Sequence, residues 1–72
     1  MTPERRAQLA KGLAKNPLLR ELFEARAEDI RETWETEDDA NKREQCWQDL
    51  RTLNDFRDFL NAKIDEYRRG AD

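Results

Sequence analysis

The C-terminal half of this chain contains a regular apolar repeat. The repeat positions are separated alternately by four and three residues: Cys46, Leu50, Leu53, Arg57, Leu60, Ile64 and Tyr67. Residues spaced in this way form one stripe along a helix that packs lengthwise against another helix. Only Arg57 interrupts its apolar character. The sequence therefore predicts a helix over residues 40–69, which ends at Gly70 after a basic pair.

Two shorter helices are predicted before it. Thr2-Pro3 and Asn16-Pro17 each place a capping side chain directly before a proline, which is typical of a helix start. The first predicts a helix over residues 3–15, with Leu9 and Leu13 on one face. The second predicts a helix over residues 17–35 with an apolar stripe. That stripe comprises Leu19, Phe23, Ile30 and Trp34, flanked by Leu22 and Ala27. The acid-rich segment 36–39 then indicates a turn and a new helix start.

The predicted lengths favour one all-α domain over residues 1–72. At 1.5 Å per residue, the third helix is about 45 Å long and the second about 28 Å. Short connections favour antiparallel neighbours, so the second helix is expected to fold back along the first two-thirds of the third. The first helix, bending at Pro17, would cover the remainder near Leu60, Ile64 and Tyr67. We expect an antiparallel helical hairpin with a short N-terminal third helix.

A chain of 72 residues buries only about 60% of the surface its unfolded form exposes, so its core needs reinforcement. Cys46 is the single cysteine and the chain contains no histidine, so neither an internal disulfide nor a typical zinc site is expected. Self-association or a partner protein is the remaining source of burial. We therefore expect a homodimer, most simply a four-helix bundle formed by two hairpins.

Three aromatic residues are the candidate interface. Trp47 and Phe59 lie well away from the centre of the repeat, and Phe56 lies at its edge. They are scattered surface aromatics, one of which the first helix could cover, or they form a second apolar surface that closes the dimer. Arg57 also has two interpretations. It either extends its guanidinium to the rim of the helix pair, or pairs with an acid across the hairpin, or is a buried polar residue that fixes register or partner choice.

Charge is distributed unevenly along the chain. Residues 1–20 carry five basic side chains and one acidic one, whereas residues 21–41 carry two basic and nine acidic ones. Arg5, Arg6, Lys11 and Lys15 form a candidate basic patch, and the alternative function is a small nucleic-acid-associated factor. A sequence pI near 5.0 argues against that alternative. The functional hypothesis is a small helical protein–protein interaction or assembly module.

Catalytic and cofactor motifs are not found. The chain has two glycines, no histidine base and no glycine at the sixth position of its acidic segment, which a calcium loop requires. We expect no enzyme, no cofactor, no metal and no small-molecule substrate. No apolar run approaches the roughly 20 residues of a membrane span, and no signal-peptide apolar region follows Met1. We therefore expect a cytoplasmic protein.

One set of residues resembles a known group of proteins. Leu18-Leu19-Arg20-Glu21-Leu22-Phe23 is followed by Ile30, Trp34, an acidic turn, then Glu44, Trp47, Leu50, Leu53 and Leu60. This pattern, over residues 16–67, resembles short helical-hairpin proteins of unassigned activity encoded in tailed-phage and prophage genomes. The resemblance implies a phage-derived accessory protein that acts in assembly or host interaction, associated with the virion or free in the cytoplasm. It assigns no functional residues.

Overall fold

The structure, a computed structural model that describes residues 1–70, consists of three α-helices: α1 (Pro3–Ala14), α2 (Pro17–Thr36) and α3 (Ala40–Arg69). No β-strand occurs among these residues, so the predicted all-helical class is confirmed. Relative to the expected ranges, α1 ends one residue earlier and α2 one residue later.

Each helix begins at a side chain that caps its free backbone N–H groups. The Thr2 hydroxyl accepts a hydrogen bond from the Arg5 N–H at 3.2 Å, and Asn16 Oδ1 accepts one from the Leu18 N–H at 2.9 Å. At α3 the cap is Asp39, whose Oδ1 accepts from the N–H groups of the second and third helical residues. Prolines occupy the first position of α1 and α2, where a missing N–H costs nothing.

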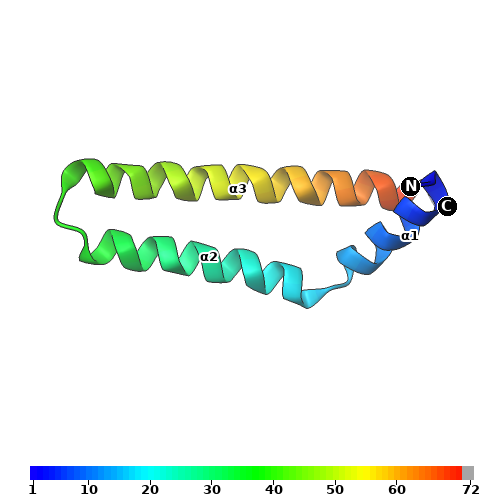
Figure 1. Ribbon diagram of the computed structural model, residues 1–72, viewed down its shortest axis with the longest axis horizontal. Helices are drawn as coiled ribbons and strands as arrows, with labels where there is room; N and C mark the ends of the chain where they lie inside the picture. Colours follow the sequence, from blue (N-terminus) through cyan, green and yellow to red (C-terminus); the bar gives the residue numbers. More distant parts are fainter. Residues whose placement is uncertain (71–72) are drawn as a thin grey trace.

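The helices form an elongated rod. Figure 1 shows α2 running back alongside α3, and α1 continuing beyond the bend at Pro17 to lie against the last part of α3. Near the α2–α3 turn, the rings of Trp34 and Trp47 meet edge to face, 5.9 Å between centroids. At the other end, the Arg6 guanidinium lies 4.2 Å from the centre of the Tyr67 ring. The start of α1 and the end of α3 therefore share one end of the rod.

The buried core is small and consists mostly of short side chains: Ala7, Ala10, Ala27, Ile30 and Cys46. The apolar repeat of α3 lies along this core, with Cys46 buried and its other apolar members half-buried. The α1 contact differs from the leucine face that the sequence suggested. Alanines three positions apart allow α1 to approach α3 closely, and Leu9 and Leu13 remain 45% and 44% exposed.

Candidate interaction surface

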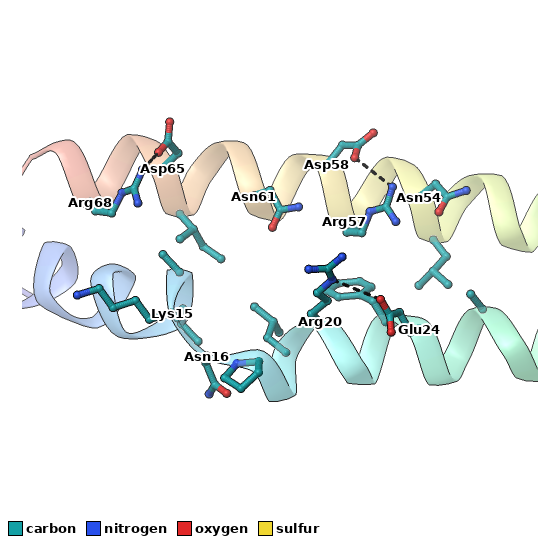
Figure 2. A pocket seen from close by; sticks show the side chains of 18 of the residues that line it. Lys15, Asn16, Arg20, Glu24, Asn54, Arg57, Asp58, Asn61, Asp65 and Arg68 are labelled. Carbon is teal, nitrogen blue, oxygen red and sulfur yellow. Dashed lines mark hydrogen bonds and ion pairs between the residues drawn. The ribbon is translucent and has the colours of Figure 1, made fainter.

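A charged groove opens on one side of the α2–α3 pair, where α2 and the α1–α2 junction diverge from α3 (Figures 1 and 2). Its volume is about 1040 Å³. Many of its lining side chains are charged residues or amides, and Figure 2 labels ten of them: Lys15, Asn16, Arg20, Glu24, Asn54, Arg57, Asp58, Asn61, Asp65 and Arg68. Half-buried apolar residues, including Leu19, Phe23 and Ile64, also line the groove.

Several charges in this groove are neutralised by a neighbour on the same helix. Arg20 Nε lies 3.3 Å from Glu24 Oε1, and Arg31 lies 3.8 Å from a carboxylate oxygen of Glu28. On α3, Arg68 pairs with Asp65. Such exposed pairs contribute little to stability, because both charges keep most of their hydration. They reduce the net charge that the groove presents to a ligand.

Arg57 lies in this groove and not in the core. Its guanidinium is 3.6 Å from Asp58 Oδ1, and its side chain is about half exposed. The repeat position places its stem near the helix seam, while the charged end reaches the hydrated groove. The interpretation of Arg57 as a buried polar residue is therefore wrong, and the rim interpretation describes its position.

The opposite side of the same helix pair carries an apolar face, which we define as Leu18, Leu22, Phe56 and Phe59. Each of these residues lies two positions before a residue that lines the charged groove: Arg20, Glu24, Asp58 and Asn61. Two positions on an α-helix are about 200° apart. Because the groove residues of α2 and α3 share one side, the four apolar residues share the other side.

The aromatic part of this face is ordered by ring contacts. The Phe56 ring lies 6.3 Å from that of Phe23 in α2, and it stacks on Phe59 at 6.4 Å with an interplanar angle of 14°. These are favourable aromatic separations. Even so, the four residues of the apolar face remain between 53% and 58% exposed. The Phe56 ring is therefore in contact with both Phe23 and Phe59, while about half of each phenylalanine of the apolar face remains exposed.

Trp47 does not lie on the apolar face with Phe56 and Phe59, although the sequence made all three candidates for one interface. It belongs to the stripe of Asn54, Asp58 and Asn61, which line the charged groove. Trp47 is 56% exposed and packs its edge against Trp34, whose ring is also covered by the Arg43 guanidinium at 4.4 Å. Trp47 therefore completes a small cluster beside the turn.

Leu18 and Leu22 were not among the candidates drawn from the sequence. They lie four residues apart, each beside a member of the α2 stripe, and so form a second apolar row about 100° around the helix. This spacing was visible in the sequence. The sequence could not show that the row lies on the same side of the molecule as Phe56 and Phe59.

The four basic candidates of α1 do not point in one direction. From their positions, Arg5, Arg6, Lys11 and Lys15 spread over about 220° of the helix circumference. The Arg6 guanidinium lies over the Tyr67 ring, while Lys11 is half-buried and Lys15 lines the charged groove. This distribution favours a structural contact with α3 and a charged end more than a continuous surface for a phosphate backbone.

The described residues 1–70 also bear on metal binding and membrane insertion. No group of three or more metal-ligating side chains lies close enough together there to hold an ion, and Cys46 is buried as a free thiol. None of the described helices is long and apolar enough to cross a membrane. No family model matches the chain, and neither a curated protein nor a solved structure matches it.

Proposed function

We propose that this chain is a helical protein–protein interaction module that self-associates into a dimer through its apolar face. The observation that carries the proposal is the amount of surface the single chain exposes. Its accessible area is 6005 Å², whereas a compact monomer of 8.6 kDa exposes about 4,700 Å². The difference, about 1,300 Å², exceeds the roughly 800 Å² that each partner buries in a standard interface.

The shape of the molecule supports the same proposal. The radius of gyration is 16.1 Å, whereas a compact chain of this length has about 11 Å. The rod is 51 Å long but only 18 and 17 Å across, so a helix pair has little interior of its own. A second layer of helices on Leu18, Leu22, Phe56 and Phe59 would create the interior that one layer lacks.

In this proposal, α2 and α3 form an antiparallel hairpin, and two hairpins form a four-helix bundle. The dimer is the working unit, and it presents its remaining charged surface to a further protein partner. The resemblance to phage-encoded helical-hairpin proteins supports an accessory role in phage assembly or host interaction. That role is also part of the proposal.

The dependence of the melting temperature on protein concentration tests the proposal. If dissociation is linked to unfolding, the melting temperature of the unaltered chain rises as its concentration rises. Phe56→Gln combined with Phe59→Gln should remove this dependence. Trp47→Gln is the matched control, because it removes an equally exposed aromatic from the other side and should leave the dependence intact. A melting temperature of the unaltered chain that is independent of concentration would overturn the proposal.

A further inference from the structure

We propose, resting on the dimer proposed above, that the second copy docks antiparallel. The α3 helix of one copy lies against α3 of the other, and the two-fold axis crosses the stacked Phe56–Phe59 pair. The α2–α3 turn of each copy then lies towards the end of its partner at which α1 begins and α3 ends. Three features of the chain support this orientation: the position of the apolar face, its internal symmetry and the charge of the two ends.

The apolar face is compact along the rod. The contact between Phe23 and Phe56 places these two residues at the same level of α2 and α3. Because α2 and α3 run in opposite directions, the midpoint between Leu18 and Leu22 then lies within about 2 Å, along the rod, of the midpoint between Phe56 and Phe59. Both pairs are therefore centred on one line across the molecule.

This arrangement is self-complementary about a two-fold axis along that line. A closed dimer uses the same patch on both copies, so each residue meets the residue related to it by the axis. Phe56 would meet Phe59 of the second copy, and Leu18 would meet Leu22 of the second copy. Aromatic rings thus pack on aromatic rings, and leucines pack on leucines.

The charge of the two ends selects the antiparallel orientation over the parallel one. Residues 28–44, around the turn, carry eight acidic and three basic side chains, whereas residues 1–20 carry five basic and one acidic. A parallel dimer would bring two acidic turns together, within the roughly 8 Å over which charges interact at physiological salt. The antiparallel dimer places each acidic turn towards a basic end, which is the electrostatically complementary arrangement.

The charged groove is unaffected by this docking. Arg20, Glu24, Asp58 and Asn61 of the groove each face about 200° away from a member of the apolar face, so each groove stays on the outside of the dimer. The antiparallel dimer therefore carries two identical grooves on its two opposite outer faces.

Distances between spin labels on the two copies test the orientation. Single cysteines replace Glu44 or Ala62 in a chain whose buried thiol has been removed, as Cys46→Ala and separately as Cys46→Ser. Glu44 and Ala62 are exposed and lie 18 residues, or five full turns, apart on the same side of α3. In the antiparallel dimer, the Glu44 labels lie about 40 Å apart and the Ala62 labels about 15 Å apart.

The two label sites separate the possible outcomes. A parallel dimer gives similar distances at both sites, which would overturn the orientation while leaving the proposed dimer in place. No coupling between labels at either site, at millimolar protein concentration, would mean a monomer and would overturn the dimer itself. A longer distance at Glu44 than at Ala62 by about 25 Å is the result expected from the antiparallel arrangement.

Discussion

Ile30→Ala is expected to cost a large part of the stability of this chain. Ile30 is 5% exposed and is the largest of the five buried residues. The substitution removes three carbon groups at about 0.8 kcal/mol each, or about 2.4 kcal/mol. The additional cavity cost should be small, because a rod 18 by 17 Å across lets its neighbours relax into the space. We expect a total of about 2.5–3 kcal/mol, against about 4–11 kcal/mol for a chain of 72 residues.

Urea denaturation, followed by helical circular dichroism at low micromolar protein, measures this cost. Leu22→Ala is the control, because it removes the same number of carbon groups from a side chain that is 58% exposed. Its cost should stay below about 1 kcal/mol at concentrations where the monomer dominates. Equal costs for the two variants, or a cost below about 1 kcal/mol for Ile30→Ala, would refute the assignment of the core.

Three further substitutions test local features of the fold. Gly12→Ala should raise the stability by about 0.5–1 kcal/mol in thermal melts, because a Cβ there meets nothing within 4 Å and alanine favours the helix. A loss of stability would contradict this expectation. Asp39→Ala should lower it by about 1 kcal/mol through the lost cap, and Asp39→Asn, which keeps the acceptor, should not. Arg6→Ala should lower the stability by about 0.5–1 kcal/mol, because it removes the contact with Tyr67. Arg5→Ala, at the exposed neighbouring position, should lower the stability by less.

Much of the local structure could be predicted from sequence because it depends on local chemistry. The hydroxyl and amide before Pro3 and Pro17 cap the first two helices, as their sequence positions imply. The alternation of four and three residues from Cys46 to Tyr67 identified the side of α3 that faces the other helices. Within the acid-rich segment 36–39, which the sequence indicated as a turn and a helix start, hydrogen bonding identifies Asp39 as the cap of α3.

The candidate surface was harder to predict because it depends on how the helices lie against each other. The helical wheel of α3 already places Trp47 about 180° from Phe56, but it cannot show that the Leu18–Leu22 row of α2 lies on the same side of the molecule as Phe56. On the helical wheel of α1, the leucines form an apolar face that could pack on α3. In the structure, the smaller Ala7 and Ala10 are the residues buried in the contact with α3. In both cases the relative rotation of two packed helices, which no single segment encodes, decided the outcome.

Sedimentation equilibrium measures whether two copies of the chain associate through the apolar face. For the unaltered chain, we expect a mass that rises from 8.6 kDa towards twice that value between micromolar and millimolar concentration. The chain that carries both Phe56→Gln and Phe59→Gln should remain at 8.6 kDa throughout. A single 8.6 kDa species for the unaltered chain over this whole range, or a variant that associates as strongly as the unaltered chain, would contradict the account.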